Sequence, residues 1–299
     1  MDDITFERIA TNGIHLNVAQ AGPEDGPLAL LLHGFPEFWY GWRKQIPALA
    51  DAGFRVWAPD QRGYNLSDKP PRVSDYSIDK LADDAAGLIA ASGRRRAIVI
   101  GHDWGGAVSW WLAANHPELI ERLVIINVPH PFVWQRLMLT DPRQTLRSWY
   151  VFALQLPWLP EWSARRRDWQ GIVRGLEKSS RPGTFTAADF AEYRRAWSQP
   201  GAMTAMVNWY RAAFRTPPRP PRNSRILPPT LVLWGVNDKF IIRRAAEMSR
   251  QRCDLGRLVL YENATHWLAH EEPDEVNRQI LEFAGVTSSP AAAVLERTG

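Results

Sequence analysis

Short runs of apolar residues that alternate with helical stretches limit the fold of this chain more than any other feature of its sequence. The apolar runs cover residues 28–32, 97–100, 123–126, 231–234 and 258–261. Apolar residues with helical spacing cover residues 40–50, 78–91, 107–115, 243–250 and 274–283. This alternation is typical of parallel strands with helices on both faces of the sheet, and such sheets bind ligands at the carboxyl ends of their strands. We therefore expect an α/β fold whose functional residues follow the apolar runs.

The alternation stops between residues 132 and 216. This stretch contains seven tryptophans, has a mostly helical pattern and includes no convincing strand, and a proline-rich return of residues 217–229 follows it. The sequence therefore predicts a core of residues 1–131 and 217–287, a helical cap of residues 132–216 and a flexible tail of residues 288–299. Most of the cap tryptophans are expected to pack the cap onto the core.

Composition excludes several classes of protein. Hydrophobic residues make up 45% and charged residues 23% of the 299 residues, which is ordinary globular usage and excludes an intrinsically disordered chain. The net charge is +4, and arginine triplets at residues 94–96 and 165–167 come without a nucleic-acid-binding motif, so no nucleic acid partner is expected. No G-x-G-x-x-G motif follows the first apolar run, so a dinucleotide cofactor is not expected either.

The sequence also predicts a cytoplasmic location. Cys253 is the single cysteine, so no intramolecular disulfide can form, as is usual in a reducing compartment. No apolar run approaches the ~18 residues of a membrane span, and the acidic start Met1-Asp2-Asp3 is unlike a signal peptide. No membrane partner is therefore expected.

The segment of residues 98–106 places an aspartate where an apolar run meets a helical stretch. Asp103 stands in the pattern G-x-D-x-G, with Gly101 two residues before it and Gly105 two residues after it. Small residues at these positions leave room for a strained strand-to-helix turn, which projects the central side chain above the sheet. A carboxylate there indicates a nucleophile that attacks sp³ carbon and forms an ester, and a helix N-cap is the structural alternative.

An ester on Asp103 has to be hydrolysed, which requires an activated water and donors that stabilise an oxyanion. The motif His33-Gly34-Phe35-Pro36 follows the first apolar run. Its position predicts that the backbone N–H groups of Phe35 and Trp104 form an oxyanion hole. A plain turn at the strand end is the alternative for His33 and the glycine after it.

The general base is expected near the end of the chain, because nucleophile, acid and histidine follow one another in this order in proteins with such a turn. His266 lies in a loop just after the apolar run of residues 258–261 and is the predicted base. His270 stands four residues later, beside Glu271 and Glu272, and is expected to be exposed to solvent.

The acid that orients this base is predicted to be Asp238, just after the apolar run of residues 231–234. The alternative place for an acid, after the run of residues 123–126, holds Asn127, which cannot supply a countercharge. A turn residue without a catalytic role is the other interpretation of Asp238.

Three segments together resemble the epoxide hydrolases of the α/β-hydrolase fold. These are residues 33–43 with the motif H-G-F-P-E, residues 63–68, and residues 101–106 with the motif G-H-D-W-G-G, and the likeness runs from about residue 6 to residue 283. The resemblance implies an eight-stranded, mostly parallel sheet with an inserted helical cap. It also implies that a small-molecule epoxide and water are converted to a vicinal diol, without a cofactor or a metal; the oligomeric state is left open.

A pair of cap tyrosines that donate to the epoxide oxygen distinguishes this family from its relatives. Residues 208–211 match the second tyrosine segment and residues 148–150 are similar to the first, so the resemblance assigns Tyr210 and Tyr150. Packing among other aromatic residues is the alternative role for both. The substrate pocket is predicted to be lined by His33, Pro36, Trp39, Trp149 and Trp267.

Two rival functions remain at this point. Haloacetate dehalogenases of the same fold carry arginines where this chain has Trp104 and Ala107, and many haloalkane dehalogenases carry asparagine where it has Phe35. The cap tyrosines favour epoxide opening over both. A non-catalytic receptor is disfavoured because nucleophile, acid and histidine are all present, and a serine esterase is excluded because the chain has no G-x-S-x-G motif.

Overall fold

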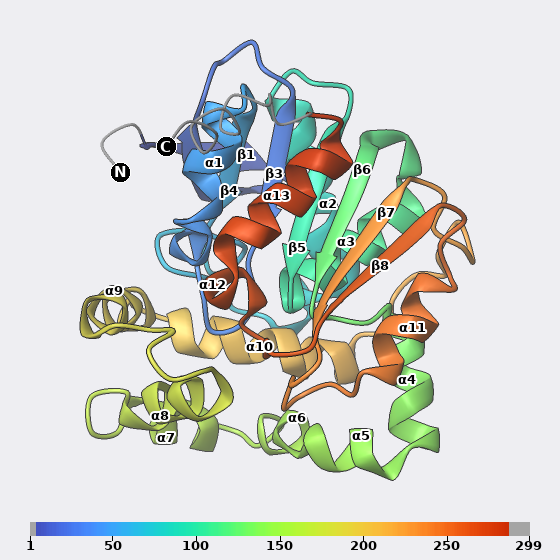
Figure 1. Cartoon of the computed structure of the whole chain (residues 1–299). Coiled ribbons are helices and arrows are strands. Elements are labelled where there is room, and N and C mark those ends of the chain that lie inside the picture. Colours follow the sequence, from blue (N-terminus) through green and yellow to red (C-terminus); the bar gives the residue numbers. More distant parts are fainter. Residues whose placement is uncertain (1–3, 287–299) are drawn as a thin grey trace, which may run out of the picture.

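Eight strands form one sheet at the centre of the molecule, in the order β1-β2-β4-β3-β5-β6-β7-β8 (Figure 1). The computed structural model describes residues 4–286, so the predicted tail of residues 288–299 lies outside the described residues. β2 pairs antiparallel with β1 and β4, and the other five pairings are parallel. The strands are β1 (Thr5–Thr11), β2 (Ile14–Ala21), β3 (Leu28–Leu32), β4 (Arg55–Pro59), β5 (Ala97–His102), β6 (Ile120–Ile126), β7 (Thr230–Gly235) and β8 (Gly256–Tyr261). The predicted eight-stranded, mostly parallel sheet is confirmed.

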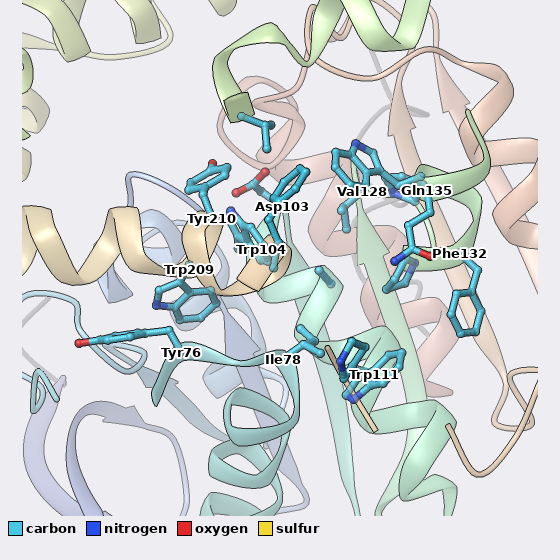
Figure 2. Close-up of a pocket in the computed structure, with 18 of the residues that line it drawn as sticks. Tyr76, Ile78, Asp103, Trp104, Trp111, Val128, Phe132, Gln135, Trp209 and Tyr210 are labelled. Carbon is cyan, nitrogen blue, oxygen red and sulfur yellow. The ribbon is translucent and has the colours of Figure 1, made fainter. Parts of the chain in front are cut away.

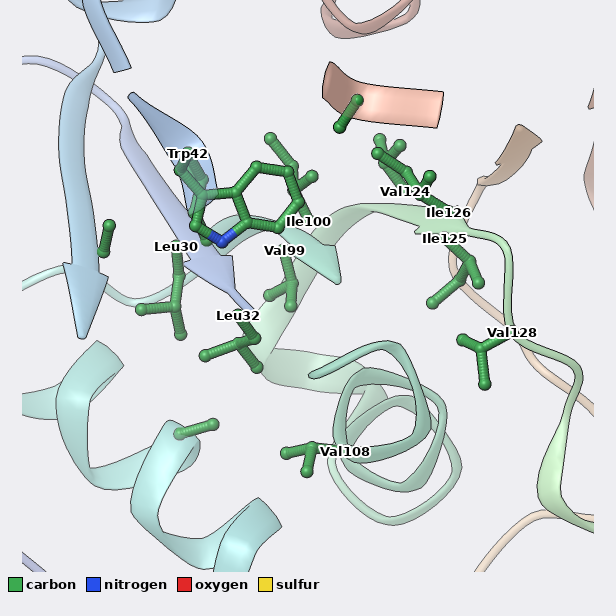
Figure 3. Close-up of a cluster of buried hydrophobic side chains, with 14 of the residues drawn as sticks. Leu30, Leu32, Trp42, Val99, Ile100, Val108, Val124, Ile125, Ile126 and Val128 are labelled. Carbon is green, nitrogen blue, oxygen red and sulfur yellow. The ribbon is translucent and has the colours of Figure 1, made fainter. Parts of the chain in front are cut away.

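Helices cover both faces of this sheet. α1 and α13 contact each other on one face, and α2 and α3 contact each other on the opposite face (Figure 1). Figure 3 shows part of the core, where branched side chains of β3, β5 and β6 pack together with Trp42 and Val108. The helices around the sheet are α1 (Gln45–Asp51), α2 (Ile78–Ala91), α3 (Trp104–Asn115), α11 (Arg244–Arg250), α12 (Leu268–Glu271) and α13 (Pro273–Ala284), with short 3₁₀ turns η1 (Trp39–Trp42), η2 (Val73–Tyr76) and η3 (Pro117–Leu119).

The helix predicted over residues 40–50 is split into η1 and α1. Pro47 has no amide hydrogen to donate and its ring collides with the carbonyl four residues earlier, so an α-helix can contain it only in the first turn. α1 accordingly begins at Gln45, two residues before this proline.

Seven helices fill the segment between β6 and β7, at the carboxyl ends of the parallel strands (Figure 1). They are α4 (Pro131–Thr140), α5 (Pro142–Arg147), α6 (Trp149–Ala153), α7 (Leu159–Arg165), α8 (Gln170–Ser179), α9 (Ala187–Trp197) and α10 (Ala202–Arg215). We call residues 131–215 the helical segment. Its boundaries as a separate cap domain of residues 132–216 stay a prediction. No helix in residues 4–286 is long and apolar enough to cross a membrane.

The tryptophans of the helical segment divide into an inner and an outer set. The buried indoles of Trp197 and Trp209 donate to the carbonyls of Pro36 and Arg62 in the core, at 2.6 and 2.9 Å. The outer tryptophans, in contrast, have exposed side chains; they are Trp149, Trp158 and Trp162. The expectation concerned most of the seven cap tryptophans, and these three, on α6 and at the start of α7, are the ones that do not pack onto the core.

Close packing at the start of α3 predicts a difference in stability between two glycine variants. A Cβ on Gly105 would lie 2.0 Å from the carbonyl oxygen of Leu32, so Gly105→Ala forces α3 off the sheet. We expect it to lower the free energy of unfolding by about 3 kcal/mol or to prevent folding. Gly175 in α8 has no neighbouring atom within 4 Å of such a Cβ. Gly175→Ala should therefore raise the free energy of unfolding by ~0.5–1 kcal/mol, because alanine favours helix. Urea denaturation measures both, and equal midpoints for the two variants would contradict the packing argument.

Candidate active site

Asp103 occupies the sharp turn between β5 and α3. Its backbone has φ 49° and ψ −123°, a conformation that side-chain-bearing residues rarely adopt. The turn holds its carboxylate against the loop after β3, where the backbone N–H of Phe35 donates to Asp103 Oδ1 at 2.8 Å. A Cβ on Gly34 would lie 2.3 Å from the Asp103 Cβ, so only glycine allows this approach. The structure thus places the predicted nucleophile at a strained strand-to-helix turn.

His266 and Asp238 lie beside this carboxylate. His266 Nε2 is 3.6 Å from Asp103 Oδ2, and its Nδ1 is 2.8 Å from Asp238 Oδ2. Asp238 is buried, and its Oδ1 accepts the backbone N–H groups of Phe240 and Ile241 at 2.7 and 3.0 Å. The fold therefore brings together Asp103 and His266, which are 163 positions apart in the chain. The carboxylate of Asp238 orients the imidazole of His266.

Asn127 supports the acid from the neighbouring strand end. Its Nδ2 donates to Asp238 Oδ2 at 2.9 Å, and its Oδ1 accepts the backbone N–H of Gly235 at 2.9 Å. Sequence reasoning considered this residue only as a substitute acid and assigned it no role. Its position could have identified it. Asn127 directly follows β6, Asp238 follows β7, and these two strands are neighbours in the sheet.

The buried charges shift the protonation of the site. Burial alone would lower the pKa of His266, but the carboxylates of Asp238 and Asp103 outweigh it and raise that pKa to about 10. Burial would likewise raise the pKa of Asp103, but its contacts with His266 outweigh burial and hold the pKa below its usual value. The resting site therefore contains a protonated imidazole between two carboxylates.

Tyr150 and Tyr210 project from α6 and α10 into the same cavity as Asp103. Their ring centroids are 6.1 Å apart, and the Tyr210 ring packs edge-on against Phe35 and Trp104 at 5.3 and 5.1 Å. Burial and the negative charge of Asp103 raise the pKa of both phenols. Both hydroxyls therefore stay protonated at neutral pH and remain able to donate.

A cavity of about 170 Å³ extends from Asp103 between α3, α4 and α10. Figure 2 shows Asp103 close to Tyr210, with Trp111 and Phe132 on other parts of the wall. Among the described residues, Asp103 is the one charged residue in the lining. Two of the indole N–H groups in the wall are directed to partners elsewhere, Trp111 to Asp79 and Trp209 to the backbone of residue 62. The cavity wall is therefore aromatic and apolar, with its reactive groups at one place.

The prediction for the pocket lining has to be corrected. None of the five predicted residues lines the cavity: they are His33, Pro36, Trp39, Trp149 and Trp267. Trp149 precedes Tyr150 on α6, and consecutive helical residues point about 100° apart, so the inward phenol leaves the indole 67% exposed. The other four are buried and have their contacts outside the cavity.

The contacts of these four residues explain their positions. His33 Nε2 accepts the backbone N–H of residue 61 at 3.0 Å, and burial lowers its pKa to about 4, so the ring stays neutral. Pro36 presents its carbonyl to the helical segment. Trp39 packs against Phe6 at a ring distance of 5.0 Å, and Trp267 donates its indole N–H to Ser179 at 2.9 Å. Their contacts are with the core and with the helical segment, and none of them lines the cavity.

The predicted oxyanion hole is located only in part. The N–H of Phe35 points at Asp103, as described above. Trp104 is the first residue of α3, so its backbone N–H has no partner within the helix, and none is found for it elsewhere in residues 4–286. The joint action of the two N–H groups on an oxyanion stays a prediction.

A second group of buried polar residues lies behind His266. Glu37 Oε1 accepts hydrogen bonds from Tyr193 and His270, both at 2.7 Å, and its Oε2 lies 3.2 Å from His102 Nδ1. Burial would raise the pKa of Glu37, but the two imidazoles outweigh burial and hold that pKa well below its usual value. The expectation that His270 is exposed is therefore wrong. Its partner is 233 residues earlier in the chain, which no local pattern reveals.

His102 connects this group to the candidate base. Its Nε2 lies 2.9 Å from the backbone carbonyl of His266, and its other nitrogen faces the carboxylate of Glu37. A neutral imidazole can donate to only one of these two acceptors. The arrangement fixes the backbone of His266 from the side opposite to the cavity. Within residues 4–286, no cluster of three or more histidine, cysteine or carboxylate side chains is arranged to hold a metal ion.

The chain is similar to known proteins along most of its length. A family model described as alpha/beta hydrolase fold matches residues 27–273. The chain is 50% identical to the AB hydrolase superfamily protein YfhM of Bacillus subtilis, over 95% of this chain and 99% of that protein. It is 36% identical to Epoxide hydrolase 4 of Homo sapiens, over 93% of this chain and 78% of that protein. A crystal structure of Bacillus megaterium epoxide hydrolase with an inhibitor matches with a TM-score of 0.84 and 29% identity, over 93% of this chain and all of the other.

The two carboxylates beside His266 predict an unusual titration. In the wild-type protein the ring should lose its proton near pH 10, because its pKa is raised to about 10 from 6.5. The contribution of this raised pKa to stability is therefore complete below about pH 6.5 and is lost as the pH rises through about 10. Asp103→Asn removes one negative charge and should lower the pKa, whereas Asp25→Asn on an exposed loop should not. NMR of the imidazole protons measures the titration, and a wild-type ring that titrates near pH 6.5 would contradict it.

Proposed function

The chain belongs to the epoxide hydrolases of the α/β-hydrolase fold, and we propose that it opens an epoxide to a vicinal diol through an ester on Asp103. One observation supports this mechanism best. Two phenols, those of half-buried Tyr150 and buried Tyr210, line the same cavity as the carboxylate of Asp103. Opening an epoxide requires a nucleophile at carbon and a proton donor at oxygen, and this cavity has both.

The first step forms the ester. A carboxylate oxygen of Asp103 attacks one epoxide carbon, the bond from that carbon to the ring oxygen breaks, and the oxygen takes a proton from Tyr150 or Tyr210. The ester carries no charge, so one of the two carboxylates that raised the pKa of His266 is neutralised and that pKa falls. His266 can then give up its proton, which compensates for the proton lost by the phenol.

The second step breaks the ester. Neutral His266 takes a proton from a water molecule, and the resulting hydroxide attacks the ester carbonyl of Asp103. The backbone N–H groups of Phe35 and Trp104 stabilise the oxyanion, and Asp238 stabilises the imidazolium that forms. Collapse of this intermediate breaks the bond between the acyl carbon and the diol oxygen, and the diol leaves with a proton from His266. The carboxyl proton that came with the hydroxide then passes to His266, which regenerates the carboxylate of Asp103 and the imidazolium.

The cavity also defines the type of epoxide. Aromatic and aliphatic side chains form its wall, and Asp103 is the one charged group among the described lining residues. A substrate with a carboxylate would be repelled by Asp103 and would lose its hydration without a partner. Uncharged epoxides with an apolar substituent therefore fit best.

The first mutational prediction separates the two steps. Asp103→Asn should abolish turnover in a folded protein, because an amide oxygen is a far poorer nucleophile. His266→Gln should still be alkylated but should retain the ester, because no base activates the water. Intact-mass spectrometry with excess styrene oxide detects the adduct, and His15→Gln at the exposed position of strand β2 is the matched control. An unmodified, folded His266→Gln protein that still binds epoxide would contradict the two-step mechanism.

The second mutational prediction concerns the phenols. Each of Tyr150→Phe and Tyr210→Phe should slow alkylation by about ten- to thousandfold, and the double variant should be slower than either, because the alkoxide then has no donor. Ester hydrolysis should be unaffected. Single-turnover kinetics with styrene oxide measure both steps. Wild-type alkylation by the double variant would show that the phenols are packing residues and would remove the main support for the proposal. Halide release from a haloalkane without diol formation would favour a dehalogenase instead.

A further inference from the structure

The helical segment exposes more large apolar side chains than the rest of the described chain. Thirteen large apolar residues are exposed in residues 4–286, and nine of them lie in α4–α10 or the loops between these helices. Trp158 is 69% exposed and Leu146 is 74% exposed, far more than is usual for residues of this kind. We define the apolar face as Leu146, Trp149, Phe152, Trp158, Trp162 and Phe214. An exposed apolar surface of this extent marks a contact with another molecule or with a membrane.

The residues of this face lie on or next to short helices that follow one another in the chain. Trp149 and Phe152 are three residues apart on α6, and Leu146 stands on α5 just before it. Trp158 precedes α7, where its carbonyl accepts the backbone N–H of Trp162 at 3.0 Å. The rings of Phe152 and Phe214 are 5.8 Å apart, so the face continues from α6 onto α10. Figure 1 shows α5, α6 and α7 at the outer edge of the molecule, on the side away from the sheet.

Basic residues accompany this face along the chain. The segment of residues 141–179 contains seven basic and four acidic residues, a net charge of +3. Three of the four acidic residues are already paired with arginines: Asp141 with Arg143 at 2.7 Å, Glu161 with Arg211 at 2.6 Å and Asp168 with Arg194 at 3.1 Å. Arg166 lies over the ring of Trp162 at 4.5 Å from its centroid. Uncompensated positive charge therefore accompanies the exposed tryptophans.

We propose that the apolar face docks on the surface of a bilayer that contains anionic phospholipid. Tryptophan is favoured at the boundary between headgroups and acyl chains, and arginine pairs with lipid phosphates. A second copy of the chain is the poorer occupant, because two faces with the same positive charge repel each other. The contact is peripheral and requires no spanning helix. It agrees with the expectation that no segment crosses a membrane, but replaces the expectation of no membrane partner.

The docking also has a consequence for substrate supply, and this part rests on the proposed function. Phe214 belongs to the apolar face and also lines the cavity that contains Asp103. Apolar epoxides partition into lipid, so docking places the cavity next to their reservoir. The docking itself does not depend on catalysis, so the two proposals can fail separately.

The experiment measures binding of the full chain to vesicles of phosphatidylcholine alone and of phosphatidylcholine with phosphatidylglycerol. We expect at least tenfold tighter binding to the anionic vesicles, and weaker binding at high salt. Trp158→Ser with Trp162→Ser, and separately Arg165→Glu with Arg166→Glu, should each weaken binding by at least tenfold. The matched controls are Leu66→Ser with Leu255→Ser and Arg95→Glu with Arg96→Glu, which change the same kinds of exposed residue on the core.

Two further readouts make the result decisive. Brominated lipids should quench the tryptophan fluorescence of the wild-type protein, which requires no variant and is unaffected by a variant that fails to fold. Turnover of styrene oxide without vesicles tests the proposed function independently. Equal binding to neutral and anionic vesicles, or no binding to either, would overturn the docking proposal, and a dimer in sedimentation velocity would identify a second copy as the occupant of the face.

Discussion

The burial of charge at the carboxyl end of the sheet is the constraint on which the rest of this structure depends. Asp238 and His266 are buried and Asp103 is half-buried beside them, and an isolated ionised group in such a place costs several kcal/mol. The cost is offset because the groups neutralise one another in part and because backbone N–H groups and the amide of Asn127 bind the remaining carboxylate oxygens. Each of these donors belongs to a different loop. The strand ends therefore have to lie where their loops can supply hydrogen-bond partners to these charges in place of water.

The same requirement connects the helical segment to the core. Glu37 is charged and buried, and its partners come from α9, α12 and the end of β5. Trp197 and Trp209 add two hydrogen bonds from the helical segment to core carbonyls. Displacement of α9 or α10 would leave these polar groups without partners inside the protein, which is more costly than the loss of an exposed contact. The position of the phenol of Tyr210 above Asp103 follows from this attachment.

The features that can be predicted from the sequence are those that depend on residues close together in the chain. Apolar runs identify β3, β5, β6, β7 and β8, and the glycines around Asp103 identify the turn, because both depend on residues that are adjacent in the chain. The sequence predicted the reactive residues of the cavity but not the aromatic and aliphatic part of its wall. Trp149 and Tyr150 are adjacent aromatic residues, so the sequence pattern alone does not distinguish them. The orientation of the five-residue helix α6 decides which of the two side chains faces the cavity. His270 was misjudged for a related reason, since its environment is created by Glu37 from the opposite end of the sequence.

The wall formed by α4 differs from the wall formed by α10 in how firmly it is held. From Ala205 to Ala212 every residue of α10 is buried, and its tryptophan is bonded to the core. Trp134 and Gln135 of α4 line the cavity from the other side, border on solvent, and make no side-chain hydrogen bond within residues 4–286. Substitutions at Trp134 and Gln135 of α4 can therefore change the range of substrates with little loss of stability. Changes in α10 would have to be compensated elsewhere, so the molecule has one face that can adapt to new ligands and one that preserves the chemistry.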